Sequence, residues 1–333
     1  MCIPFNLNLP LSCGLEILNL IVSAEPMSKN IILFQAHELS EETVKAFQSL
    51  KNAVSAKHKV ILLLDTKNIP VVPADLKDEI FSFSSLDFKN WGLLTWGKSM
   101  LPGHCHFPIM RYHMFNQNYD YLWLIEYDVR FTGDWNLFLD SYENDNADLL
   151  CCHLKLRSEE PNWYWWKSFD YRSNSSLMDG CTDLPIEAAS NQGIKHLRCF
   201  LVVSRFSNAA ISDLIKTHSG KWLAHQEFIV PTSLVFNGFK VRDFNGRSFN
   251  CEPITRKRKF YSSSSDLEGS MVYWGSVRFR PSFKTSGYRK NFLYHPVKPI
   301  YKPSSNYFMN EIYMYIRSYL SLLKARFVRT FPH

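Results

Sequence analysis

The fold is decided by one stretch of the sequence, Tyr121-Leu122-Trp123-Leu124-Ile125-Glu126-Tyr127-Asp128-Val129. Its large apolar residues follow one another without a break, which is typical of a strand buried on both faces of a parallel sheet. Because side chains alternate across a strand, Glu126 and Asp128 are predicted to share one face at its carboxyl end, and Tyr127 to point the other way. Ligands bind at this edge of open α/β sheets. The stretch therefore predicts a central strand that ends at a ligand site.

Two carboxylates so placed can bind a hard divalent cation, Mn²⁺ or Mg²⁺, which keeps other positions for water and substrate phosphates. The alternative is that both are solvated residues at the start of a loop. The residues that follow, Arg130 to Trp135, predict a turn into a helix capped by Asp134, and this favours a defined structure there. The pattern thus indicates a site for a cation and a diphosphate.

A regular pattern of strand, helix and strand precedes this stretch. Ile31 to Phe34 predicts a buried strand, Ser40 to Val54 a capped helix, and Lys59 to Leu64 a second buried strand. Such a unit has a right-handed crossover and parallel strands. The turn after the first strand, Gln35-Ala36-His37, has neither the G-x-G-x-x-G nor the G-x-x-x-x-G-K pattern, so a dinucleotide-binding or P-loop fold is disfavoured.

The rest of the chain predicts further alternation of helices and strands. The expected helices are 107–116, 135–142, 204–214 and 223–236, and the expected strands are 147–152, 197–203 and 240–244. The fold class is therefore α/β, a single domain with a mostly parallel central sheet flanked by helices.

The acidic motif Glu126-Tyr127-Asp128 resembles the short Asp-x-Asp-type signature that follows a buried strand in GT-A nucleotide-sugar glycosyltransferases. The order of elements between 197 and 244, which includes a Gly-x-Trp turn at Gly220-Lys221-Trp222 and an acidic helix start, also resembles the second half of that domain. The resemblance implies a GT-A-like, Rossmann-like domain over residues 27–300. It implies cation-dependent transfer of a sugar from a nucleotide-sugar donor to a hydroxyl of a glycan or lipid-linked acceptor.

The same resemblance implies a donor site. In that family the ends of the first two strands hold the nucleoside, and a basic residue of the helix expected here at 107–116 lies near the nucleotide. The donor-binding residues implied here, with the tyrosine of the motif included, are Gln35, His37, Asp65, Lys98, Arg111 and Tyr127. A basic residue on a helix can equally belong to a solvated face.

A third metal ligand is implied late in the chain. Many metal-dependent relatives use a late histidine that reaches back to the cation, and His295 matches this position, beside Glu126 and Asp128 as the other metal ligands. The alternative is an ordinary surface or core histidine.

The acceptor side is implied by two features. An acidic residue at the helix start faces the acceptor in this family, and Glu227 matches it, although the family's usual acidic pair is absent. With inversion Glu227 would be the base; retention would give it another role, and the alternative is a favourable charge at a helix N-terminus. Flat aromatic faces stack on sugars, so Trp163, Trp165 and Trp166 are predicted to bind the acceptor. Alternatively, two of the aromatics in this run pin a loop onto the core.

Composition sets broad limits. The 333 residues are 46% hydrophobic and 21% charged, as in ordinary globular proteins. A net charge of +7 suits nucleotide diphosphates or an anionic membrane surface, and it is too small to argue for nucleic acid. The 8 cysteines include no C-x-x-C pair, which favours a reducing, cytoplasmic compartment.

The two ends of the sequence differ from the domain between them. Residues 1–26 lack the basic start of a signal peptide and are a poor membrane span, and we expect a poorly ordered extension. Residues 301–333 predict an aromatic, basic amphipathic helix that suits peripheral binding to an anionic membrane. That helix could instead pack on its own domain or in a homodimer.

Two other functions remain open from the sequence. A nucleotidyltransferase would need a glycine-rich basic loop after its first strand, and Gln35-Ala36-His37-Glu38 does not provide one. A catalytically silent protein of the same fold that binds a sugar or a membrane is the second alternative.

Overall fold

A computed structural model describes residues 30–54, 58–68, 74–95, 99–100, 103–161, 163–166, 168, 195–220, 223–262, 286–287 and 289–298. The extension expected at 1–26, the candidate Lys98 and the helix expected within 301–333 lie outside these residues. Among the described helices, none has the length and apolar character needed to cross a bilayer.

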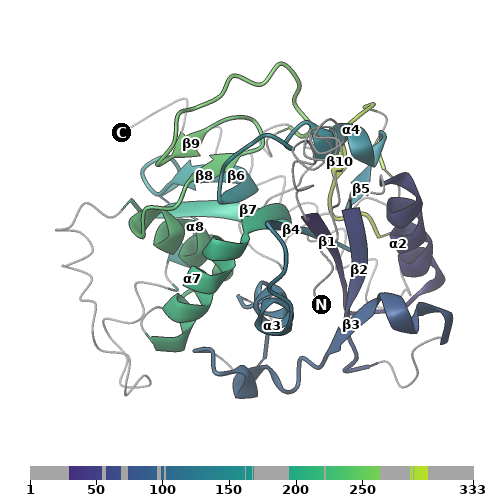
Figure 1. The fold of residues 1–333 in the computed structure, drawn as a ribbon. Coiled ribbons are helices and arrows are strands. Elements are labelled where there is room, and N and C mark those ends of the chain that lie inside the picture. The colour runs from purple at the N-terminus through teal and green to yellow at the C-terminus, as the bar shows by residue number, and fades with distance from the viewer. Residues whose placement is uncertain are drawn as a thin grey trace, which may run out of the picture.

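The described chain alternates helices and strands (Figure 1). In order, the elements are β1 (Asn30–Ala36), α2 (Glu41–Ala53), β2 (His58–Asp65), η1 (Ala74–Glu79), β3 (Ile80–Phe83), η2 (Phe88–Trp91), α3 (Phe107–Phe115), β4 (Tyr121–Glu126), β5 (Arg130–Phe131), α4 (Trp135–Asp140), β6 (Leu149–Leu156), η3 (Tyr164–Trp166), β7 (Leu197–Ser207), α7 (Asn208–Gly220), α8 (Gln226–Phe236), β8 (Val241–Asp243), β9 (Ser248–Phe249) and β10 (Leu293–Tyr294).

The central sheet has 8 strands in the order β3-β2-β1-β4-β7-β6-β8-β9. The strands β3, β2, β1 and β4 are parallel neighbours, whereas β7 is antiparallel to both β4 and β6. The prediction of a mostly parallel sheet is therefore confirmed, since β6 and β8 are also parallel, and the exceptions are the antiparallel strands β7 and β9. Continuous apolar runs predict strands buried on both faces, and they carry no information on strand direction when helices cover both faces.

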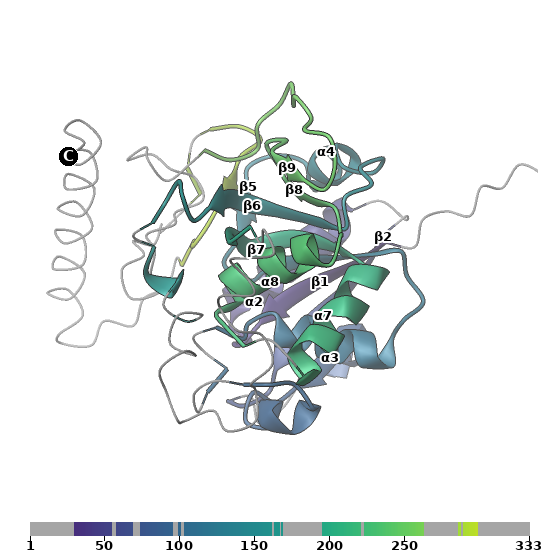
Figure 2. The ribbon, with the colours of Figure 1, turned by 90° about the vertical axis from the view of Figure 1, so that its left-hand side faces the viewer.

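The two faces of the sheet are covered by different helices (Figures 1 and 2). Phe34 of β1 contacts Phe47 of α2, and Trp123 of β4 contacts Phe138 of α4. On the opposite face α3, α7 and α8 pack against one another. Because side chains alternate along β4, Leu124 and Glu126 point to this second face, opposite to Trp123.

The α2 helix shows why local sequence specifies an element here. Ser40 is its N-cap and accepts a hydrogen bond at Oγ from the Thr43 N–H at 3.2 Å. Its buried residues, Thr43, Phe47 and Leu50, follow a helical spacing that turns one face to the sheet. The helix predicted from Ser40 onward is thus confirmed, and β1 and β2 are parallel as expected.

Two predicted boundaries in the second half of the domain are wrong. The helix expected to start at Ser204 does not start there, because β7 continues to Ser207 and Ser204 pairs with Leu124 of β4. The helix expected to start at Leu223 begins at Gln226, with His225 as its N-cap. In both cases the surrounding sheet or cap fixes the boundary, and the apolar pattern alone does not.

Asp145 carries a stability prediction, because it is a buried anion with two cationic partners. Its side chain is 1% exposed and forms ion pairs with Arg242 and Arg256. Asp145→Ala would leave both guanidinium groups without their counter-ion, so we expect the free energy of unfolding to fall by about 3–5 kcal/mol. Urea unfolding followed by circular dichroism measures this loss.

The matched control is Arg247→Ala, which breaks the Arg247–Glu159 ion pair, where both side chains are more than 30% exposed (34% and 37%). Solvent screening limits its cost to about 1 kcal/mol. Equal costs for the Asp145→Ala and Arg247→Ala variants would contradict the role assigned to Asp145.

Candidate metal centre

The centre begins where β4 ends. The strand stops at Glu126, and residues 127–128 form a turn that the hydrogen bond from Val129 N to Glu126 O closes at 2.9 Å. The Tyr127 N–H also donates to Gln35 O of β1 at 2.9 Å. The alternation predicted for Glu126, Tyr127 and Asp128 within one strand is therefore wrong, because Asp128 is placed by a turn. The two carboxylates nevertheless converge.

A small second sheet brings His295 to these carboxylates. The strand β5, directly after the turn, pairs antiparallel with β10, so that Arg130 lies opposite Tyr294. His295 follows β10, and the Val297 N–H donates to Asp128 O at 2.8 Å. Backbone hydrogen bonds therefore hold the segment that carries His295 against the turn that carries Asp128.

Three side chains meet at this place. His295 Nε2 lies 3.3 Å from Asp128 Oδ1 and 3.6 Å from Glu126 Oε2. Each of the three residues offers one ligand atom, and these three atoms lie within 4.8 Å of one another. Within the described part of the chain, Glu126, Asp128 and His295 are the group of acidic, histidine or cysteine side chains that could hold a metal ion. Two carboxylate oxygens and one imidazole nitrogen suit Mn²⁺ or Mg²⁺, so the residues fit the predicted cation.

The exposure of the three side chains shows that the group opens to solvent at Glu126. His295 and Asp128 are 2% and 6% exposed, and Glu126 is 23% exposed. Burial lowers the pKa of His295, but Asp128 and then Glu126 outweigh it, so that the pKa is raised above its ordinary value. A positive charge is thus favoured between the carboxylates, and a bound cation would supply one as well.

Sequence reasoning missed Lys298. Its Nζ lies 3.5 Å from Asp128 Oδ2 and 5.6 Å from the centre of the Tyr127 ring. The signal that could have found it is its position three residues after His295, as the charged residue nearest to the histidine in the sequence. Lys298 adds a second positive charge next to the acidic motif.

The position of the centre in the sheet agrees with where ligands bind in α/β proteins. From β1 the chain goes to β2 and β3 on one side and then returns to β4 on the other side of β1. The carboxyl ends of β1 and β4 therefore form a topological switch point, outside which ligands bind. Gln35 of β1 and Glu126 of β4 are register partners at this point.

Three of the predicted donor-binding residues lie beside the centre. Gln35 donates from Nε2 to Cys105 O at 3.0 Å, and its Oε1 is buried without a hydrogen-bond partner in the described chain. The ring of His37 contacts the ring of Tyr127 edge-on, with 4.7 Å between centroids. Gln35, His37 and Tyr127 are thus brought together at the ends of β1 and β4.

The two other donor candidates within the described residues, Asp65 and Arg111, have structural partners. Asp65 Oδ1 accepts hydrogen bonds from Lys67 N at 3.1 Å and Ser85 N at 2.9 Å, which ties the loop after β2 to the loop after β3. The guanidinium of Arg111 lies over the rings of Trp91 and Phe115, at 5.7 and 4.6 Å from their centroids. These contacts account for Asp65 and Arg111 without a ligand.

The tryptophans predicted to bind an acceptor divide into two kinds. Trp163 and Trp166 are buried, at 6% and 2% exposure, and Trp166 Nε1 donates to Glu160 O at 2.8 Å. For these two the structure favours the alternative, a loop pinned onto the core. Trp165 is half-buried and stacks on the His225 ring with 4.2 Å between centroids. It is the least buried of the three.

Glu227 lies in the first turn of α8 and is 2% exposed. Its backbone N–H donates to Nδ1 of His225, the N-cap, at 3.3 Å. Through His225, the start of α8 is connected to Trp165. The candidate base and the half-buried Trp165 are therefore neighbours of the same histidine.

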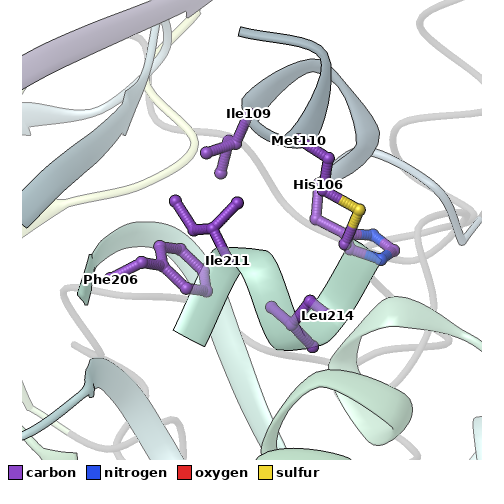
Figure 3. Close-up of a pocket in the computed structure, with 6 residues that line it drawn as sticks. All are labelled: His106, Ile109, Met110, Phe206, Ile211 and Leu214. Atoms are coloured by element: carbon purple, nitrogen blue, oxygen red, sulfur yellow. The ribbon is translucent and has the colours of Figure 1, made fainter. Parts of the chain in front are cut away.

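A small pocket lies between α3 and α7 (Figure 3). Five of the residues that line it are apolar, and the sixth is His106. It contains none of the predicted ligand-binding residues, and its apolar lining does not suit a diphosphate.

Comparisons with known proteins give little beyond this geometry. No protein-family model matches the sequence, and no curated protein matches it. Among solved structures, the chain is similar to the apo crystal structure of mouse xyloside xylosyltransferase 1, with a TM-score of 0.31 and 10% identity over 63% of this chain and 82% of that chain. At these values the likeness carries no argument about activity.

Proposed function

We propose that this chain is a glycosyltransferase that moves a sugar from a nucleotide-sugar donor to a hydroxyl of a glycan or lipid-linked acceptor and requires Mn²⁺ or Mg²⁺. The observation that carries the proposal is the convergence of Glu126, Asp128 and His295 at the carboxyl end of β4, at the switch point of the sheet. The resemblance of the acidic motif to that of GT-A enzymes supports it.

Glu126, Asp128 and His295 would hold the cation. When bound, such a cation supplies a Lewis acid that neutralises charge on a leaving diphosphate. Lys298, whose Nζ lies 3.5 Å from Asp128 Oδ2, adds a positive charge that can attract the same diphosphate. Gln35, His37 and Tyr127 are the residues we propose to contact the nucleoside.

In the proposed reaction, the bond between the anomeric carbon and the diphosphate oxygen breaks, and a bond from that carbon to the acceptor oxygen forms. The acceptor hydroxyl gives its proton to the carboxylate of Glu227, and the nucleoside diphosphate leaves with the bonding electron pair. We propose that Trp165 stacks on the acceptor sugar, because its ring is half-buried and is held by His225.

The test is hydrolysis of a panel of nucleotide sugars by the full-length chain with Mn²⁺ or Mg²⁺. We expect at least one donor to be hydrolysed, and EDTA to stop the reaction. A chain that neither hydrolyses nor binds any donor of the panel with either cation would overturn the proposal. Hydrolysis that EDTA leaves intact would remove the cation from it.

A further inference from the structure

The start of α8 is held by contacts from outside the helix. Gln226 is 9% exposed, and its Oε1 accepts a hydrogen bond from His106 N at 3.0 Å and lies 3.3 Å from His106 Nδ1. In the other direction, Gln226 N donates to Gly103 O at 3.0 Å. Hydrogen bonds in both directions thus link the loop before α3, which is residues 103–106, to the first residue of α8.

These outside contacts matter because the helix cannot stabilise its own first turn fully. Pro231 lies inside α8. A proline has no N–H, so it cannot donate the usual helix hydrogen bond to the carbonyl four residues earlier, which here belongs to Glu227. The position of Glu227 therefore depends more on the N-cap and on the link through Gln226 than it would in an uninterrupted helix.

The link continues into a pair of buried histidines. His106 Nε2 lies 2.8 Å from His218 Nε2, in the last turn of α7, and the two residues are 2% and 0% exposed. Figure 3 shows His106 at the end of the small pocket between α3 and α7. The pair joins α3, α7 and α8.

The hydrogen-bond pattern limits the protons that the pair can carry. The backbone N–H of His106 needs an acceptor, so the oxygen of Gln226 faces it, and His106 Nδ1 must then carry a proton to bond the same oxygen. His106 Nε2 is left as an acceptor, and His218 Nε2 donates to it. A proton on both facing Nε2 atoms would place two N–H groups opposite each other, so the folded pair can carry at most one extra proton.

The surroundings favour a neutral His106 ring. Burial, and then His218, His104 and His225, lower the pKa of His106 well below its ordinary value, and the hydrogen bond to Gln226 opposes this only in part. These groups come from the loop before α3, from α7 and from α8, and none of them is an acid. No charge among them would stabilise an imidazolium at this position.

The loop of residues 103–106 also reaches the carboxyl end of the sheet. Gln35 Nε2 donates to Cys105 O at 3.0 Å, and Gln35 is the register partner of Glu126. The loop therefore connects β1, at the edge that carries the metal centre, with the start of α8, which carries Glu227.

We propose that Gln226 and His106 are positioning residues, which fix the first turn of α8 and Glu227 relative to the ends of β1 and β4 as long as His106 and His218 are not both protonated. We call this set of contacts the latch. Its effect on transfer rests on the proposed function, whereas its hold on α8 does not.

The stability of the latch depends on pH. In the unfolded chain both histidines take up protons below a pKa of about 6.5. The latch is therefore complete above that pH and loses stability as the pH falls below it.

The first test is Gln226→Leu, which removes the acceptor for His106, with Gln117→Leu at an exposed position as the matched control. Hydrogen exchange of full-length chains at pH 7.5 should show the amides at the start of α8 exchanging about tenfold faster in Gln226→Leu only. Where the proposed activity is present, kcat for transfer should fall by about ten- to a hundredfold with KM for the donor unchanged. Unchanged exchange protection at α8 would overturn the latch.

The second test is His218→Gln, in which an amide nitrogen replaces Nε2 as donor and does not titrate. The wild-type protection factors at the start of α8 should fall between pH 7.5 and 5.5, and those of His218→Gln should fall less. Equal loss in both chains would overturn the proton dependence, even if Gln226→Leu does not fold. A wild-type chain that is inactive on every donor but shows both exchange effects would refute the proposed function and leave the latch standing.

Discussion

Asp128→Ala is expected to abolish both cation-dependent donor hydrolysis and cation-dependent binding of a nucleoside diphosphate. The side chain of Asp128 is 6% exposed, and its Oδ1 lies 3.3 Å from His295 Nε2, at the centre of the proposed ligand set. Without it, one carboxylate and one imidazole would have to hold a hydrated cation, which binds weakly. Loss of Lewis-acid stabilisation amounts to several kcal/mol, or on the order of 10³ in rate.

The substitution should spare the surrounding fold, because the hydrogen bond from Val297 N goes to the backbone carbonyl of Asp128. Calorimetric titration with Mn²⁺ alone measures loss of the cation site directly. Asp134→Ala is the matched control: Asp134 is exposed and caps α4 by accepting from Asn136 N at 2.9 Å. It should lower stability by about 1 kcal/mol and leave turnover intact. Turnover that survives both EDTA and Asp128→Ala would rule out the metal centre.

The elements that could be predicted from the sequence are those whose pattern is local. The apolar run of β4, the N-cap Ser40 and the parallel pairing of β1 and β2 follow from residue spacing, capping chemistry and the crossover rule. The convergence of Glu126 and Asp128 could also be predicted from the sequence, although a turn and not strand alternation produces it. Local chemistry was enough wherever neighbours in sequence decide the geometry.

The parts that could not be predicted depend on contacts between distant segments. Strand β7 extends through Ser207 because its end pairs with β4, and no local signal at Ser204 reports that partner. Lys298 joins the acidic motif only because β5 pairs with β10, each a strand of two residues and too short to show a period. The latch is of the same kind, since His106 and Gln226 are 120 residues apart.

Glu227→Gln is expected to lower turnover by roughly 10²–10⁴ while binding of the donor and the cation survives. The amide keeps the shape of the side chain and removes its ability to accept a proton. The N-cap contact from the Glu227 backbone N–H to His225 does not involve the substituted atoms, so the start of α8 should remain in place.

The control for this prediction is Glu42→Gln, because Glu42 is also the second residue of its helix, α2. Both substitutions remove a favourable charge at a helix N-terminus, which is worth about 0.3–1 kcal/mol, so both should lower stability slightly. Only Glu227→Gln should lower turnover. Equal turnover in the two variants would return Glu227 to the role of a helix-start charge. Because Asp128→Ala is expected to lose donor binding and Glu227→Gln to keep it, the two variants together distinguish a defect in the metal centre from a defect in proton transfer.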